Sequence, residues 1–147
     1  GVPYVLMHMR GTPATMQSLT DYDGNVTAAV IADLAAKADR LAQAGVCDII
    51  IDPGFGFSKT LEQNYRLLAD LEAFKLLGRP LLVGVSRKSM ATRLLGISAD
   101  EALNATTVIN TLAIERGASI LRVHDVKACR EAVSIIYDGL LPQTGQS

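Results

Sequence analysis

A carboxylate, a stiff turn and two glycines occur together at residues 52–57, which read Asp-Pro-Gly-Phe-Gly-Phe and follow an apolar run. Proline restricts the backbone of the turn, and glycine allows a ligand to approach the main chain closely. An ionised carboxylate only accepts hydrogen bonds, so Asp52 is suited to the paired N–H donors of a flat heterocycle with an amidine-like or guanidine-like edge. The alternative is that Asp52 only caps the turn that follows it.

Basic side chains follow two further apolar runs. Residues 86–89 read Ser-Arg-Lys-Ser and precede an expected helix, where positive charge opposes the helix dipole. Such a conflict with local preference is typical of a functional site, and solvated charge at a helix start is the alternative. Arg122 and His124 alternate, so we expect them on one side of a strand, where an Arg fork and a His donor suit a phosphate. Taken alone, His124 fits a buried core histidine equally well.

Four apolar runs precede these polar groups and predict strands at residues 4–9, 48–52, 81–85 and 119–123. The runs lack clean alternation, which indicates strands buried on both faces of a parallel sheet. Between them, apolar residues recur every three or four positions and predict helices. The first helix ends before Gly45, the second runs from a capping box at Thr60 and Gln63 to Gly78, and a short third lies near Met90. A fourth is capped by Ser98 and Glu101 and stops at Gly117, and a fifth spans about 127–138 with Asp125 as its cap.

The resulting order, strand then helix four times over, predicts a parallel sheet with right-handed crossovers. Two architectures remain open on this evidence: a doubly wound open sheet, or half of a (β/α)8 barrel, since a whole barrel needs roughly 200–250 residues. In both, ligands bind at the carboxyl ends of the strands. The polar groups follow the carboxyl ends in all four units, which predicts one composite site. Residues 143–147 are expected to form a frayed tail.

Composition excludes several classes of protein. The chain has 147 residues, with 14 Lys and Arg against 15 Asp and Glu, so we expect neither nucleic acid nor a membrane surface as a partner. No apolar run is long enough to cross a membrane. Cys47 and Cys129 lack the spacing of a disulfide framework or a zinc site, and His8 and His124 lack that of a metal site. These features predict a cytoplasmic protein.

Four motifs, in order, resemble those of the dihydropteroate synthase family: Met-His-Met-Arg-Gly at 7–11, Asp-Pro-Gly-Phe-Gly-Phe-x-Lys at 52–59, Gly-x-Ser-Arg-Lys-Ser at 84–89 and Arg-Val-His-Asp-Val at 122–126. The resemblance implies a transferase of folate biosynthesis, a target of sulfonamides. It joins p-aminobenzoate to 6-hydroxymethyl-7,8-dihydropterin diphosphate, with magnesium as cofactor, and yields 7,8-dihydropteroate and pyrophosphate. The implied fold is an α/β TIM (β/α)8 barrel, of which residues 1–147 would be the C-terminal half, strands 5–8, as a partial pterin-binding domain.

The same resemblance assigns a substrate contact to eight residues of this chain. The pterin pocket would be lined by Met7, Asp52, Gly84 and Lys88, with Asp52 on the 2-amino and ring N–H edge. The departing diphosphate would be held by Arg122 and His124. The p-aminobenzoate pocket, where sulfonamide-type mimics compete, would be bordered by Phe57 and Ser89. The catalytic residues expected from the family are Lys88, Arg122 and His124.

The chain opens directly before a strand, with no signal peptide, and we expect it to be a piece of a longer protein. By resemblance, the missing half would carry the magnesium ligand, so none is expected here and the chain alone is expected to be inactive. Open sheet edges predict a homo-oligomer or self-associated half barrels. Two alternatives are a methyltetrahydrofolate-type pterin-binding methyltransferase, which needs no diphosphate-binding residues, and a non-catalytic half barrel that binds pterin or an anion.

Overall fold

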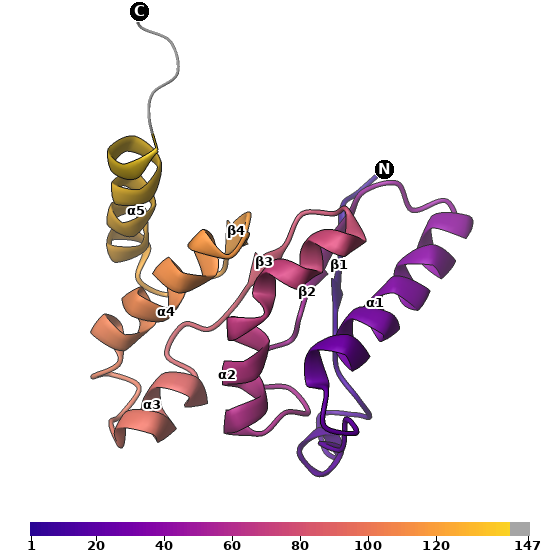
Figure 1. The fold of residues 1–147 in the computed structure, drawn as a ribbon, viewed down its shortest axis with the longest axis horizontal. Helices are drawn as coiled ribbons and strands as arrows, with labels where there is room; N and C mark the ends of the chain where they lie inside the picture. The colour runs from indigo at the N-terminus through magenta and orange to yellow at the C-terminus, as the bar shows by residue number, and fades with distance from the viewer. Residues whose placement is uncertain (142–147) are drawn as a thin grey trace, which may run out of the picture.

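Four short strands alternate with helices in a computed structural model, which describes residues 1–141; residues 142–147, and with them the tail expected at 143–147, lie outside the described part. The first half consists of β1 (Tyr4–Met7), the 3-10 helix η1 (Met16–Ser18), α1 (Val26–Gln43), β2 (Ile49–Asp52), α2 (Leu61–Ala69) and the 3-10 helix η2 (Leu71–Leu77). The second half consists of β3 (Leu82–Val83), α3 (Ser89–Leu95), α4 (Leu103–Glu115), β4 (Ile120–Leu121), α5 (Val126–Ser134) and the π-helix η3 (Ile135–Leu140). Figure 1 shows α1 at one end of the molecule and α5 at the other.

All strand pairing in this part of the chain is parallel, as the sequence predicts. β1 pairs with β2 over four residues, so that Met7 lies opposite Asp52, and β3 pairs with β4 over two. A single parallel bridge between Ile51 and Leu81 joins the two pairs. The strands therefore follow one another in chain order, without the reversal of order that a doubly wound sheet has. The four strands exist where they are expected but are shorter than their apolar runs.

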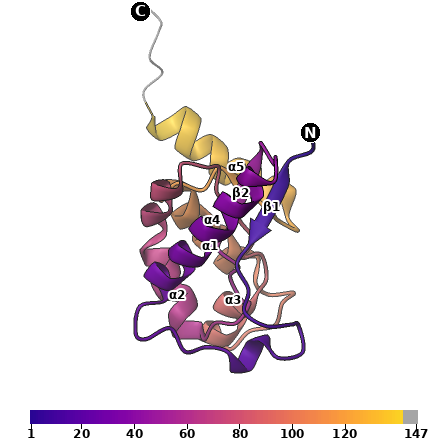
Figure 2. The ribbon, with the colours of Figure 1, turned by 90° about the vertical axis from the view of Figure 1, so that its right-hand side faces the viewer.

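The sheet is covered on one face only. Leu6 and Ile51 are buried, whereas Val5 is 47% exposed and Ile50 is half-buried. Burial on both faces, as the continuous apolar runs predict, is therefore wrong for the first two strands. Successive side chains of a strand point to opposite faces, and within residues 1–141 the helices cover only one of them. The outer edges of β1 and β4 pair with no other strand in that part of the chain; Figure 2 shows β1 at such an edge.

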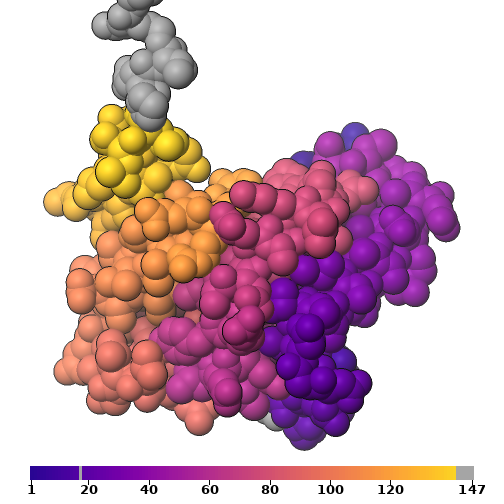
Figure 3. Space-filling view, viewed as in Figure 1, coloured from indigo at the N-terminus to yellow at the C-terminus, as the bar shows by residue number. Residues whose placement is uncertain are grey.

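The core lies between the covered face of the sheet and the helices. Val30 and Leu34 of α1 are completely buried, as are Leu67 of α2 and Leu71 of η2. Each such side chain contributes about 1.5–3 kcal/mol relative to an exposed one. In the space-filling view, α2 and η2 occupy the middle of the molecule, with the α1 segment on one side and α4 on the other (Figure 3). No helix within residues 1–141 is both long and apolar enough to span a bilayer.

Of the two helix starts predicted from capping boxes, the one at Thr60 is confirmed and the one at Ser98 is wrong. The capping box of α2 is confirmed: Thr60 Oγ1 accepts the Gln63 N–H at 3.1 Å, and Gln63 Oε1 accepts the Thr60 N–H at 2.8 Å. The cap expected at Ser98 is wrong, because α4 begins only at Leu103. Glu101 Oε2 instead accepts the Ser98 N–H at 3.1 Å and closes a separate turn ahead of the helix.

The last helix also departs from the prediction. It is α-helical over Val126–Ser134 and continues as the π-helix Ile135–Leu140. Asp125 occupies the N-cap position but its side chain makes no capping hydrogen bond. The carboxylate of Asp125 is bound instead to the guanidinium of Arg87, which follows β3 in the chain. A local capping signal has thus been overridden by a partner 38 residues away.

Candidate functional site

The strand tips meet at one edge of the sheet, and three charged side chains from three of them lie within electrostatic reach of one another. Asp52 ends β2, Lys88 precedes α3 and Arg122 follows β4. The charges of Lys88 and Arg122 both act on the Asp52 carboxyl, and the charge of Arg122 also acts on Lys88. Met7, from the tip of β1, stands directly opposite Asp52 in the strand register. The structure therefore brings parts of all four motifs together.

The carboxylate of Asp52 is half-buried and held by the turn that follows it. Its Oδ1 accepts the N–H of Gly54 at 2.9 Å. Burial raises the pKa of the Asp52 carboxyl, an effect opposed by that hydrogen bond and by the charges of Lys88, Lys59 and Arg122. Within residues 1–141 Oδ2 has no hydrogen-bond partner, which leaves it to accept from a ligand. Asp52 therefore caps the turn through Oδ1, as one of the two sequence interpretations expects. Its role as an acceptor for a ligand stays a prediction.

Gly54 is the position in this turn where the chain tolerates no side chain. Its backbone is left-handed, with φ +74°, and a Cβ built on it would lie 1.9 Å from the carbonyl oxygen of His8. That distance is far inside van der Waals contact, so the tip of β1 and the turn after β2 touch through bare backbone.

Lys88 lies beside the aromatic ring predicted for the site. Its Nζ donates to the carbonyl oxygen of Phe55 at 3.2 Å and lies 5.0 Å from the centroid of the Phe57 ring. Burial lowers the pKa of Lys88, the charge of Asp52 raises it and the charge of Arg122 lowers it, with a net downward shift. The ammonium group is thereby tied to the loop after β2, within electrostatic reach of the Asp52 carboxylate.

Gly84 and Arg122 form the part of the site between β3 and β4. A Cβ on Gly84 would lie 3.7 Å from the Cβ of Arg122 and 3.8 Å from Lys88 Nζ, so the Gly84 backbone lies close to both side chains. Arg122 itself is exposed. Ser89, the first residue of α3, is half-buried directly after Lys88. Of the three charged residues Asp52, Lys88 and Arg122, only Arg122 is exposed to solvent.

His124 is exposed, so the interpretation as a buried core histidine is wrong. Its Nδ1 lies 2.9 Å from Ser86 Oγ, and its backbone N–H donates to the same oxygen at 3.2 Å. The buried Ser86 therefore fixes His124 to the loop after β3. Arg122 and His124 are both exposed and Val123 between them is half-buried, which agrees with the predicted alternation.

Arg87, the second cation at residues 86–89, has a different role from the one suggested by its position in the motif. Its Nε and Nη2 donate to the two carboxylate oxygens of Asp125 at 2.9 and 2.8 Å, and its Nη1 donates to the carbonyl of Ala99 at 2.6 Å. The hydrogen bond from Arg87 lowers the pKa of Asp125. Arg87 therefore joins the loops that precede α3, α4 and α5, and only Lys88 of the pair faces Asp52.

Two residues next to the site are buried and contact each other, which the sequence does not predict. His8, which follows β1, is 1% exposed, and Lys59, which ends the second motif, is 4% exposed. Their side chains meet at 3.0 Å between Lys59 Nζ and His8 Nδ1. The signal that could have identified Lys59 is a lone cation closing a Gly-rich turn, since such a turn exposes carbonyl oxygens that a buried ammonium can bind.

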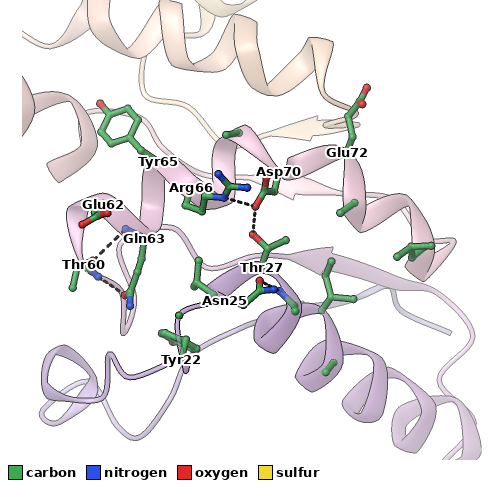
Figure 4. Close-up of a pocket in the computed structure, with 18 residues that line it drawn as sticks. Tyr22, Asn25, Thr27, Thr60, Glu62, Gln63, Tyr65, Arg66, Asp70 and Glu72 are labelled. Atoms are coloured by element: carbon green, nitrogen blue, oxygen red, sulfur yellow. Dashed lines mark hydrogen bonds and ion pairs between the residues drawn. The ribbon is translucent and has the colours of Figure 1, made fainter.

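A groove of about 1540 Å³ lies elsewhere, between α1 on one side and α2 and η2 on the other (Figure 4). Its two walls are joined by Thr27 Oγ1, which donates to Asp70 Oδ2 at 2.8 Å, and Arg66 donates to the same oxygen at 2.9 Å. None of the eight predicted site residues lines this groove. Within residues 1–141 there is also no cluster of three or more His, Cys, Asp or Glu side chains that could hold a metal ion.

Comparison with known proteins identifies relatives of the whole arrangement. Residues 1–124 match the family model described as "Pterin binding enzyme". The dihydropteroate synthase of Escherichia coli (strain K12) is 44% identical over 138 residues, which are 92% of this chain and 49% of that protein. The chain thus spans about half the length of the curated relatives it matches.

Two solved structures show the same fold. Dihydropteroate synthase from Thermus thermophilus, in complex with 4-aminobenzoate, superposes with a TM-score of 0.91 at 40% identity, over 96% of this chain and 58% of that one. Dihydropteroate synthase from Yersinia pestis, in a sulfonamide drug complex, gives a TM-score of 0.89 at 38% identity, over 93% of this chain and 50% of that one.

Proposed function

Because this chain belongs to the pterin binding enzyme family, we propose that it supplies part of a dihydropteroate synthase site, namely the part that binds the pterin ring and its diphosphate. The resemblance to dihydropteroate synthase seen in the four motifs is confirmed by the relatives. The proposed reaction of the complete site joins p-aminobenzoate to 6-hydroxymethyl-7,8-dihydropterin diphosphate and releases pyrophosphate.

The observation that carries this proposal is a single half-buried carboxylate with cations from the neighbouring strand tips around it. Asp52 offers an oxygen that accepts but cannot donate, which suits the 2-amino and ring N–H edge of a pterin. Lys88 and Arg122 act on that carboxylate from the next two tips. A ligand with a donor edge at one end and a polyanion at the other matches this distribution of charge.

The chemistry of the proposed reaction follows from where charge develops. The bond between the pterin methylene carbon and the diphosphate oxygen breaks, and its electron pair leaves with the pyrophosphate. The amine nitrogen of p-aminobenzoate forms the new C–N bond and then loses a proton, so no covalent enzyme intermediate is needed. Arg122 and His124 would stabilise the leaving anion, and donors aimed at developing charge contribute about 3–4 kcal/mol each.

The remaining predicted residues take supporting roles in this proposal. Lys88 would contact the pterin ring and share in catalysis with Arg122 and His124. The pterin pocket would be lined by Met7, which lies opposite Asp52 in the strand register, and by Gly84, which lies near Lys88. The p-aminobenzoate pocket, and with it the sulfonamide pocket, would be bordered by Phe57 and Ser89, the two half-buried neighbours of Lys88.

We further propose that residues 1–147 form a partial pterin-binding domain, the C-terminal half of a (β/α)8 barrel with strands 5–8. Three observations support this. The strands are parallel and follow chain order, the face of the sheet away from the helices is left uncovered, and the chain spans about half the length of its relatives. A closed barrel would cover that face with the side chains of its other strands.

Magnesium enters the proposal as a partner of the complete barrel. The donor set within residues 1–141 does not fit a metal ion, because no three carboxylate, imidazole or thiolate groups come together there. We therefore expect the ligand in the half of the barrel that this chain does not span, and none of the roles given above depends on the metal. The cytoplasm is the compartment we propose, because both cysteines are free.

The open edges lead to a proposal about assembly. The two edge strands also have exposed apolar side chains, Val5 of β1 at 47% exposure and Ile120 of β4 at 37%. Unpaired strand edges are templates for further pairing, so we expect the chain by itself to self-associate, two half barrels together. Size-exclusion chromatography with light scattering tests this, and a stable, soluble monomer would contradict it.

Complementation tests the proposed activity. The chain is mixed with the part of a dihydropteroate synthase that it does not span, and formation of 7,8-dihydropteroate is measured. We expect activity only from the mixture, and a loss of at least about tenfold for Lys88→Ala or Arg122→Ala. Recovery that survives both substitutions would contradict the site assignment. Absence of any recovery, with pterin still bound, would favour a non-catalytic binding module.

A ligand competition separates this proposal from a pterin-binding methyltransferase. Methyl transfer from a reduced folate involves no diphosphate, so it gives no reason for Arg122 and His124 to bind an anion. We expect pyrophosphate to compete with 6-hydroxymethyl-7,8-dihydropterin diphosphate for the chain. Binding of the pterin ring without any competition by pyrophosphate would favour the methyltransferase.

A further inference from the structure

We propose that Lys59 is a positioning residue for this site: its ammonium group fastens the turn that carries Asp52 and Phe57 to the tip of β1. The inference rests on the proposed function, since it describes how that same site is held. Lys59 is enclosed by the protein, with only 4% of the residue exposed, so we do not expect it to contact a ligand directly. Its effect on a ligand would be transmitted through the residues it binds.

The first argument is the number of acceptors around the Lys59 nitrogen. Nζ donates to the carbonyl oxygens of Gly54 at 2.9 Å and Phe57 at 2.8 Å, and it lies 3.0 Å from His8 Nδ1. An ammonium group has three N–H donors and no acceptor, whereas a neutral amine has only two donors. The three partners therefore match the charged form of Lys59 with His8 as the third acceptor.

The second argument is the state of the His8 ring. If Nδ1 accepts from Lys59, the ring proton is on Nε2, which lies 3.8 Å from Asp33 Oδ2. In the reverse arrangement, with Nδ1–H donating to a neutral amine, the lone pair of Nε2 would face that carboxylate and be repelled by it. The same oxygen of Asp33 lies 2.7 Å from Lys37 Nζ, which holds the carboxylate in place beside the ring.

The third argument is the path from Lys59 into the site. The carbonyl oxygen of Gly54 accepts a hydrogen bond from Lys59, and the N–H of Gly54 donates one to Asp52 Oδ1. Gly54 thus links the ammonium group to the carboxylate. The second carbonyl bound by Lys59 belongs to Phe57, whose ring lies beside Lys88. A single buried side chain thus sets the positions of the proposed pterin acceptor and of the proposed p-aminobenzoate wall.

The charges around the pair define the pH range in which this arrangement exists. Burial lowers the pKa of Lys59 to about 7; the charge of Asp52 raises it, and those of Arg10 and Lys88 lower it. Burial and the charge of Lys59 lower the pKa of His8 to about 4, with Asp33 opposing and Lys37 and Arg10 adding to the shift. The ammonium and the neutral imidazole therefore coexist mainly between about pH 4 and pH 7.

The decisive measurement is nitrogen NMR of the full chain, which contains only two histidines, His8 and His124. We expect His8 to be protonated on Nε2 and not on Nδ1 at pH 6. In Lys59→Met the pKa of His8 should rise by about one unit, because a neighbouring cation has been removed. The exposed His124 is the internal control. A proton on Nδ1, or a pKa of His8 that does not move in Lys59→Met, would overturn the inference.

Ligand binding then tests the consequence for the site. The dissociation constant for 6-hydroxymethyl-7,8-dihydropterin diphosphate should rise about tenfold in Lys59→Met, and the weakening of wild-type binding above pH 7 should disappear in that variant. Lys127→Met, which removes a cation 94% exposed on α5, is the matched control. Unchanged binding in Lys59→Met would overturn the inference. If the wild-type chain binds no pterin, the proposed function fails, while the NMR result still decides whether Lys59 holds the turn.

A second pair of variants covers the case in which Lys59→Met does not fold. His8→Asn keeps an oxygen or nitrogen close to the position of Nδ1, so Lys59 retains its third partner. His8→Phe has a similar shape but no acceptor. We expect His8→Asn to bind the pterin diphosphate within about twofold of wild type and His8→Phe to bind it about tenfold more weakly. Equal binding by the two variants would contradict the inference.

Discussion

The tips of β1 and β2 are held together by buried groups, whereas the tips of β3 and β4 are held together near the surface. At the first pair, His8 and Lys59 are almost completely enclosed. At the second pair, the linking side chains are Arg87 and Asp125, which remain 23% and 27% exposed. In both regions a pair of polar side chains fixes the loop that follows a short strand, but the first pair is shielded from water and the second is partly exposed to it.

The difference matches the two ends of the proposed ligand. Hydrogen bonds to a flat heterocycle gain most where water is excluded, and the half-buried Asp52 lies on the buried side. A diphosphate is suited to charge-assisted hydrogen bonds such as those of an arginine fork, and Arg122 and His124, the two residues proposed to hold it, are both exposed. The loop after β2 and the loop after β3 also each contain a non-glycine residue with a left-handed backbone. These residues are Ser58 and Arg87, both at φ +54°.

The largest expected effect breaks the contact between the first two tips. Gly54→Ala should lower the free energy of unfolding by about 4 kcal/mol, because the added methyl group collides with the His8 carbonyl and the backbone is left-handed. Gly78→Ala, also at positive φ but with open space around it, should cost only about 1 kcal/mol. Urea denaturation of both variants measures the two losses, and similar values would contradict the steric explanation.

Ligand binding sharpens the comparison between the two ends. Asp52→Asn should weaken binding of 6-hydroxymethylpterin and of its diphosphate equally, by about a hundredfold, since a half-buried charged acceptor is lost. Arg122→Ala should weaken only the diphosphate form, by about tenfold. Isothermal titration calorimetry with both ligands distinguishes the cases. The assignment of the two ends would be wrong if Asp52→Asn affected the diphosphate form alone.

The acid dependence of stability probes the buried tip. The pKa of His8 is about 4 in the folded chain, whereas its ordinary value is 6.5. As the pH falls from 6.5 to 4, His8 therefore becomes protonated in the unfolded chain but stays largely neutral in the folded chain. Wild type should lose about 2 kcal/mol over that range relative to His8→Asn. Denaturation series at several pH values measure the difference, and His124→Asn serves as the control from the exposed tip. Parallel pH curves for wild type and His8→Asn would contradict the prediction.

The smallest effect belongs to the exposed tip. Asp125→Asn should lower stability at neutral pH, but less than the changes at the buried tip, because water and salt screen the Arg87 pair. Arg87 lowers the pKa of Asp125, so the contribution is present above the ordinary value of 3.8 and disappears as the pH falls below it. Urea midpoints of wild type and Asp125→Asn should therefore converge in acid and in high salt. A difference that grows with salt would contradict this account.

The local parts of the fold could be predicted from sequence. The capping box at Thr60 and Gln63 forms as expected because both partners lie within one turn of the same helix. The strands appear where apolar runs predict them, and their parallel pairing follows from the helices between them. The polar residues after the strands, such as Asp52 and Lys88, come within electrostatic reach of one another because parallel strands end at the same edge.

The choice between possible partners was decided only by the tertiary structure. Asp125 has the right type and position for a helix cap, yet its carboxylate binds Arg87 from another loop. Lys59 looks like an ordinary charged residue after a turn, yet it is buried against His8 and two carbonyl groups. The sequence states which groups can donate and accept. Which of several suitable partners a group binds depends on the distance between them and on the exclusion of water. Both are set only when the chain has folded.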